Sequence, residues 1–131
     1  MKQKMNNVIF DASTLLALIK NESVNIELKK LLGNVSMSSV NVSEVAGILL
    51  ESGMSYQECK NYIEPFVNSI VPFDEEQSFL AATIKKQTRH LGLSLGDRAC
   101  ITLWLITGYP IYTADKAWAN VQLNCKIILI R

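Results

Sequence analysis

Short apolar runs alternate along the chain with longer segments in which apolar residues recur at helical spacing. Each run spans three or four residues and is bounded by polar or turn-forming residues, as is typical of buried parallel strands. The predicted strands are Val8–Phe10, Val35–Met37, Ile70–Phe73, Pro110–Thr113 and Ile127–Ile130. Pro72 lacks a backbone donor, so the third run is expected at an edge of the sheet.

The segments between these runs carry apolar residues three and four positions apart, together with start and stop signals for helices. The predicted helices are a segment around Leu15–Ile19, then Val24–Leu32, Asn41–Ser52, a helix opened by the capping box Ser55–Glu58, a helix capped by Asp74 and reaching about His90, Ser94 to about Thr107, and a short helix after Asp115. Glycines that follow several of these segments are suitable C-terminal stops.

Strands that alternate with helices indicate an α/β fold. We expect a three-layer α/β/α sandwich with a mainly parallel central sheet of about five strands. The chain of 131 residues shows no linker or repeat, so residues 1–131 are predicted to form a single domain. Right-handed crossovers place the carboxyl ends of all parallel strands at one edge, where open α/β sheets bind ligands.

Composition narrows the possible functions only slightly. The net charge of +1 gives no general basic field, so any nucleic-acid binding would use a local patch. The three cysteines have no metal-type spacing, and we interpret them as buried or half-buried side chains of a reducing compartment. The polar start Met1–Asn7 does not resemble a signal peptide, and apolar stretches such as Ile101–Ile106 are too short to cross a membrane. A cytoplasmic location is expected.

Four acids, Asp11, Glu44, Asp97 and Asp115, each stand where a strand or tight turn leads into a helix. If these points meet at one edge of the sheet, the carboxylates would repel one another unless a cation lay between them. Mg²⁺ and Mn²⁺ prefer such oxygen ligands. The pattern therefore predicts a metal-dependent enzyme that acts on a phosphate-containing substrate.

Each of the four acids also has a structural explanation as a helix cap. The two that directly follow strands suit N-cap positions, whereas Glu44 and Asp97 stand three residues after Asn41 and Ser94, as in a capping box. Caps do not require acids, however, because Ser, Thr and Asn serve equally well. The joint placement favours a functional role, while the other eight acids lie in polar surroundings typical of a solvated surface.

Other catalytic chemistries lack the residues they need. His90 is the single histidine, which excludes a multi-histidine zinc site, and no nucleophile elbow, phosphate-binding loop or dinucleotide fingerprint is present. A position near a helix C-terminus suits His90. Trp104 and Trp118 are interpreted as packing residues rather than as platforms for nucleic-acid bases.

Four segments resemble, in order and spacing, the PIN-domain ribonucleases, and most closely the VapC-like toxins of bacterial toxin–antitoxin pairs. These segments are Val8–Ser13, Asn41–Glu44, Leu93–Cys100 and Tyr112–Trp118. The resemblance implies a divalent-metal endoribonuclease that works as a homodimer and is silenced by a cognate antitoxin. The run Ile101–Trp104 is bulkier than the small residues expected there, but it leaves the acids in place.

The resemblance also implies a role for each site residue. The four acids match the acidic site, Thr113 matches a hydroxyl that supports the last acid, and Ser13 matches a small polar residue near the metal. As a hypothesis, Mg²⁺ or Mn²⁺ binds mainly between Asp11 and Asp97, and the other two acids complete the site directly or through water. A neighbouring carboxylate would act as the general base.

Basic residues near the acids are candidates for holding RNA phosphates. They are Arg98 and Lys116, with Lys85, Lys86 and Arg89 as further candidates, and ordinary surface charge is the alternative for all of them. Three other functions stay open: a metal-dependent phosphatase, a non-enzymatic receiver-like signalling domain, and a PIN-fold repressor that binds DNA with its antitoxin. The receiver-like alternative fits less well because the first strand is followed by a single acid.

Overall fold

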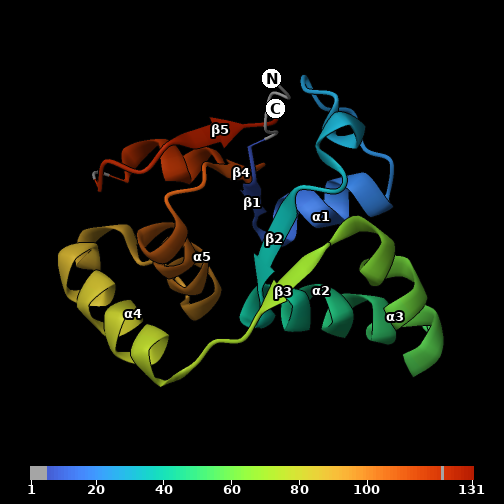
Figure 1. The fold of residues 1–131 in the computed structure, drawn as a ribbon, viewed down its shortest axis with the longest axis horizontal. Helices are drawn as coiled ribbons and strands as arrows, with labels where there is room; N and C mark the ends of the chain where they lie inside the picture. Colours follow the sequence, from blue (N-terminus) through green and yellow to red (C-terminus); the bar gives the residue numbers. More distant parts are fainter. Residues whose placement is uncertain (1–5, 122) are drawn as a thin grey trace, which may run out of the picture.

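Five parallel strands form a single sheet in the computed structural model, which describes residues 6–121 and 123–131 (Figure 1). The strands are β1 (Val8–Phe10), β2 (Val35–Ser38), β3 (Ser69–Val71), β4 (Ile111–Thr113) and β5 (Ile127–Leu129). Their order across the sheet is β3-β2-β1-β4-β5, and every neighbouring pair is parallel. All five predicted strands are thus confirmed, and β3 lies at an edge as predicted, although it ends at Val71 and does not include Pro72. Residues 1–5, most of the polar N-terminal segment, lie outside the described residues.

Helices follow the strands as the periodicity predicted. The α-helices are α1 (Ala12–Ile19), α2 (Ser39–Glu51), α3 (Tyr56–Ile63), α4 (Glu75–Gln87) and α5 (Leu95–Thr107). Short 3-10 helices are η1 (Leu28–Leu31), η2 (Glu64–Phe66), η3 (Arg89–Leu91) and η4 (Lys116–Asn120). The capping box at Ser55 is confirmed, and α5 ends at Gly108, whose φ of 75° is a left-handed conformation that favours glycine.

The helix predicted over Val24–Leu32 is wrong, because only the 3-10 turn η1 forms in that segment. The backbone N–H of Asn25 donates to the carbonyl of Ile130 at 2.7 Å, which ties the start of this segment to the residue that follows β5. The start predicted for α2 is also wrong. Ser38 caps this helix by accepting a hydrogen bond from the N–H of Val40, so the helix begins before Asn41.

Two apolar clusters lie on opposite faces of the sheet. In β1, Val8 and Phe10 belong to the cluster that contains residues of α1, α2 and α3, whereas Ile9 belongs to the cluster that contains residues of α4, α5 and η4. Figure 1 shows α4 and α5 on one side of the sheet and α1, α2 and α3 on the other. The predicted three-layer α/β/α sandwich is therefore confirmed. Trp118 is fully buried in the second cluster, which agrees with its predicted packing role.

The connectivity changes direction at the centre of the sheet. From β1 the chain adds β2 and β3 on one side, and it then crosses through α4 and α5 to add β4 and β5 on the other side. The carboxyl ends of β1 and β4 consequently flank the point where open α/β sheets form their ligand crevice. No helix in the described part of the chain is long and apolar enough to cross a membrane.

Candidate functional site

Asp11 follows β1 directly and begins α1 as its N-cap residue. Its side chain is buried, with 6% of its surface exposed. The Oδ1 atom accepts hydrogen bonds from the Thr14 N–H at 2.9 Å and the Ser13 hydroxyl at 2.7 Å. The Oδ2 atom accepts a bond of 2.5 Å from the Thr113 hydroxyl. The carboxylate is thus fixed by three donors and is both a helix cap and a member of a larger polar network.

Burial raises the pKa of Asp11 above its ordinary value, although the hydrogen bonds from Thr113, Ser13 and Thr14 act in the opposite direction. The site therefore disfavours the negative charge that a free aspartate would carry. Within the described part of the chain, none of the ion pairs includes Asp11 or the other three acids. A bound cation would supply the compensation that no basic side chain provides.

Hydrogen bonds join the carboxyl ends of β1 and β4 around Asp11. The Thr113 hydroxyl donates to Asp11 and accepts the N–H of Asp115 at 3.0 Å. The Ser13 hydroxyl accepts the N–H of Ala114 at 2.9 Å. Ser13 and Thr113, which the resemblance singled out, both lie in contact with Asp11. The Asp115 side chain is exposed and caps η4 by accepting the N–H of Ala117.

Asp97 lies in the first turn of α5, where its capping role is confirmed. Its Oδ2 atom accepts the Ser94 N–H at 3.1 Å, and its own N–H donates to the Ser94 hydroxyl at 3.1 Å. This reciprocal pair fixes the carboxylate at the helix N-terminus, where a negative charge is favoured. Capping and metal binding are compatible, because a carboxylate has more acceptor positions than one cap uses.

Glu44 lies in the second turn of α2, so the capping-box explanation for this acid is wrong. Its exposed side chain reaches from α2 to the first turn of α5. A Cβ atom added at Gly96 would lie only 2.5 Å from Oε2 of Glu44 and 2.6 Å from its Cδ. The Glu44 carboxylate thus lies against the backbone of the residue that precedes Asp97.

The buried thiol of Cys100 lies in α5, and the charges of three of the acids act on it. Its pKa is raised well above the ordinary value, first by burial and then by negative charges that include Asp11, Asp97 and Glu44. Asp11 is the N-cap residue of α1, Glu44 lies in the second turn of α2, and Asp97 lies in the first turn of α5. Contacts join these elements in pairs: the Glu44 carboxylate lies against Gly96, beside Asp97, and the Thr113 hydroxyl links Asp11 to the backbone N–H of Asp115.

The donor set fits a hydrated Mg²⁺ or Mn²⁺ ion better than an ion fully enclosed by protein. Within the described residues, no three Asp, Glu, His or Cys side chains are grouped closely enough to hold a metal by themselves. Mg²⁺ commonly keeps several waters and takes only one or two protein carboxylates. Oxygen atoms are the only side-chain donors of the four acids, which suits such a hard ion and not a thiolate-binding one.

The candidate phosphate-binding residues are placed differently from one another. Arg98 is half-buried, and its Nη1 donates to the carbonyl of Ala81 in α4 at 3.2 Å. This contact favours a structural role in joining α4 to α5. Lys116 is exposed beside Asp115. The other three bases are exposed on the C-terminal part of α4 and on η3.

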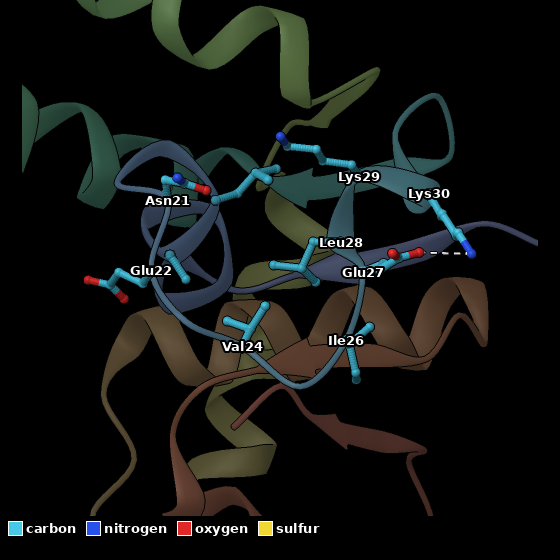
Figure 2. Close-up of a pocket in the computed structure, with 10 residues that line it drawn as sticks. Asn21, Glu22, Val24, Ile26, Glu27, Leu28, Lys29 and Lys30 are labelled. Atoms are coloured by element: carbon cyan, nitrogen blue, oxygen red, sulfur yellow. Dashed lines mark ion pairs between the residues drawn. The ribbon is translucent and has the colours of Figure 1, made fainter.

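A cavity of about 280 Å³ lies at the other end of α1, beyond the C-terminus of the helix (Figure 2). It is lined by Ala17, Leu18, Asn21, Glu22, Val24, Ile26, Glu27, Leu28, Lys29 and Lys30. Figure 2 shows Lys30 paired with Glu27, at 2.8 Å between charged atoms. Because none of the four acids lines this cavity, it does not form part of the candidate metal site.

The family model described as PIN domain matches residues 8–123. The chain belongs to the PIN domain family. No match was found among curated proteins. The match covers every one of the four acids, so the resemblance seen in the sequence motifs is confirmed at the level of the family.

Solved structures of low sequence identity share the fold of this PIN domain. A DNA-bound VapBC complex from Salmonella typhimurium is 15% identical with a TM-score of 0.71, covering 94% of this chain and 97% of that chain. VapBC2 from Rickettsia felis, bound to a promoter DNA fragment, is 13% identical with a TM-score of 0.72, covering 95% and 98%. VapBC-5 from Mycobacterium tuberculosis is 13% identical with a TM-score of 0.64, covering 97% and 99%.

Two residues beside the acids were not recognised as site residues in the sequence. Both lie in segments that resemble the PIN-domain ribonucleases, but the sequence predicts Asn41 only as a helix start and Gly96 only as part of a capping sequence. The one sequence signal that could have pointed to this pair is Gly96 itself. It lies in the first turn of a helix, where a better helix former would ordinarily be expected. The contact that explains this glycine is with Glu44 in α2, and local patterns cannot reveal a contact between two helices.

Proposed function

We propose that this PIN domain is a divalent-metal-dependent endoribonuclease and the toxin of a toxin–antitoxin pair. The observation that carries the proposal is the buried Asp11 carboxylate, which forms no ion pair with a basic side chain among the described residues. The family match and the fold of the VapBC complexes support it.

Asp11 and Asp97 would hold Mg²⁺ or Mn²⁺, and Glu44 and Asp115 would complete the site directly or through water. When bound, the ion supplies charge neutralisation for the substrate phosphate and lowers the pKa of water. Ser13 and Thr113 keep the Asp11 carboxylate in one orientation through their hydroxyl bonds.

The attack of water on a phosphodiester needs a group that removes a proton. Glu44 suits this role because its carboxylate is exposed, lies at the carboxyl edge and is not part of a cap. Lys116, exposed beside Asp115, is a suitable contact for an RNA phosphate. Arg98 is assigned to structure instead, because its guanidinium donates to α4.

The solved relatives suggest the partner. The Salmonella and Rickettsia structures are VapBC complexes bound to DNA, and a Klebsiella pneumoniae structure of the same fold is described as a toxin–antitoxin complex. We propose a cognate antitoxin for this chain, whose Arg or Lys side chain would occupy the cation position. The active form would be a cytoplasmic homodimer.

The test of this proposal is the sequencing of RNA ends after brief expression of the wild-type chain or its Asp11→Asn variant. New internal RNA ends should accumulate with the wild type alone. A phosphate-release assay on small phosphomonoesters, run beside it, separates a phosphatase from a nuclease. Phosphate release without RNA cleavage would favour the phosphatase, and neither activity would favour a signalling domain.

A further inference from the structure

Asn41 joins α2 to α5 at the point where Glu44 reaches the candidate site. Its side chain is buried, with 2% of its surface exposed. The Nδ2 atom donates to Oε1 of Glu44 and to the carbonyl oxygen of Gly96, each at 3.0 Å. Both partners are acceptors, so they fix which side of the amide carries the donor.

Gly96 provides the space into which the Glu44 carboxylate fits. Its φ is not among the positive values of the chain, so an ordinary residue would satisfy its backbone conformation. A Cβ at this position would nevertheless lie 2.5 Å from Oε2 of Glu44, far inside van der Waals contact. The atoms in the way belong to the end of a flexible side chain. A methyl group would therefore displace Glu44 and leave the fold unchanged.

Asn41 lowers the stability of the folded protein more than an apolar residue would, if its role is only to join two helices. The Oδ1 atom is buried and has no hydrogen-bond partner among the described residues. A buried acceptor without a partner destabilises a protein, and an apolar side chain would pack here without that penalty. The arrangement is explained if Asn41 is retained for the orientation that it gives to Glu44.

We propose that Asn41 and Gly96 form a seat that positions the Glu44 carboxylate beside Asp97. This inference rests on the proposed metal site and names the residues that act on it through Glu44. A free glutamate samples many rotamers, and binding an ion would have to order it. The seat removes much of that entropy cost beforehand, so it raises metal affinity without any contact between Asn41 and the ion.

The test compares Gly96→Ala with Gly47→Ala, since both glycines lie within α-helices. A Cβ at Gly47 would meet nothing within 4 Å, so Gly47→Ala is a matched control. Mn²⁺ binding is measured by calorimetry on the purified full chain, and the melting temperature is measured in EDTA. Gly96→Ala should weaken Mn²⁺ binding about tenfold without lowering the melting temperature, because alanine is a better helix former than glycine. Gly47→Ala should leave Mn²⁺ affinity unchanged.

A Glu44→Ala background shows whether the effect passes through Glu44. Once that carboxylate is removed, Gly96→Ala should change Mn²⁺ affinity less than about twofold, and so should Asn41→Leu. Equal Mn²⁺ affinity in the wild type and Gly96→Ala would overturn the seat alone. The same would follow if Gly96→Ala weakened binding equally with and without Glu44. If the wild type bound no Mn²⁺, or bound it as weakly as Asp11→Asn, the proposed metal site itself would fall.

Discussion

At the scale of single residues, Asp11 combines burial with negative charge. Its three hydrogen-bond donors hold the carboxylate in place, yet burial raises its pKa despite them. Glu58 is an acid in the opposite situation: it lies on the surface, and the Ser55 N–H and hydroxyl lower its pKa. The two acids therefore predict opposite dependences of stability on pH.

The first prediction compares Asp11→Asn with the wild type by thermal melting in EDTA. Because the folded pKa of Asp11 is raised, the folded state keeps its proton at a pH where the unfolded chain has lost it. The contribution of this group to stability is complete below the unfolded pKa and is lost as pH rises through the folded pKa. The melting temperature of Asp11→Asn, relative to wild type, should thus be higher at pH 7 than at pH 4.

Glu58→Gln is the control with the opposite sign. The lowered pKa of Glu58 gives stability that is present above the unfolded pKa and is lost as pH falls. Relative to wild type, Glu58→Gln should become less stable as pH rises.

Adding Mn²⁺ at pH 7 should raise the melting temperature of the wild type but not of Asp11→Asn. A difference between Asp11→Asn and wild type that does not change with pH would contradict the account.

At the scale of elements, two helices begin with the same reciprocal cap. Ser55 and Glu58 open α3, and Ser94 and Asp97 open α5. The first pair lies on the surface away from the acids, whereas the second fixes an acid of the candidate site. The two caps therefore separate the effect on helix stability from the effect on the site.

The second prediction is that Ser55→Ala and Ser94→Ala cost similar stability, on the order of 1 kcal/mol each, since each loses one N-cap. Only Ser94→Ala should also weaken Mn²⁺ binding, because Asp97 loses the N–H···Oγ bond that completes its cap. Urea denaturation gives the stabilities, and calorimetry gives the affinities. Equal Mn²⁺ affinity in the two variants would show that the cap of α5 does not serve the site.

The strands were predictable because short apolar runs between turn residues have few alternatives. Val24–Leu32 is predicted as a helix but forms only the 3-10 turn η1, and the bond from Asn25 to Ile130 that ties it to the end of the chain is contained in no local pattern. Asp11 and Asp115 could be selected as candidates from their positions at strand-to-helix junctions, whereas Glu44 lies in the second turn of α2 and Asp97 in the first turn of α5. The seat of Asn41 and Gly96 could not be selected in this way, because it depends on the close approach of α2 and α5.

At the scale of the whole molecule, sheet topology decides which residues meet. The order β3-β2-β1-β4-β5 places β1 between β2 and β4, so Asp11 lies beside the end of β4 and Thr113. The chain reverses direction across the sheet at this pair, which is where a crevice forms in open α/β sheets. The placement of the acids thus follows from connectivity and not from sequence distance.

The third prediction concerns assembly. We expect a small, acidic-to-neutral antitoxin to be encoded beside this chain and to purify with it, and we expect the complex to cleave RNA more slowly than the isolated chain. Pull-down of the tagged chain from its native host, followed by mass spectrometry of what is bound, checks this. A free homodimer with no neighbouring partner gene would point to a housekeeping nuclease instead.

The most direct test is the rate at which the purified, antitoxin-free chain cleaves an end-labelled RNA in Mn²⁺, measured beside Asp11→Asn and beside wild type in EDTA. We predict that the wild type cleaves the RNA in Mn²⁺ and that a folded Asp11→Asn variant does so at a rate at least about a hundredfold lower. Cleavage by the wild type should be lost in EDTA and should recover when Mn²⁺ is restored. Full cleavage by folded Asp11→Asn, or by the wild type in EDTA, would contradict a metal-dependent nuclease at these acids.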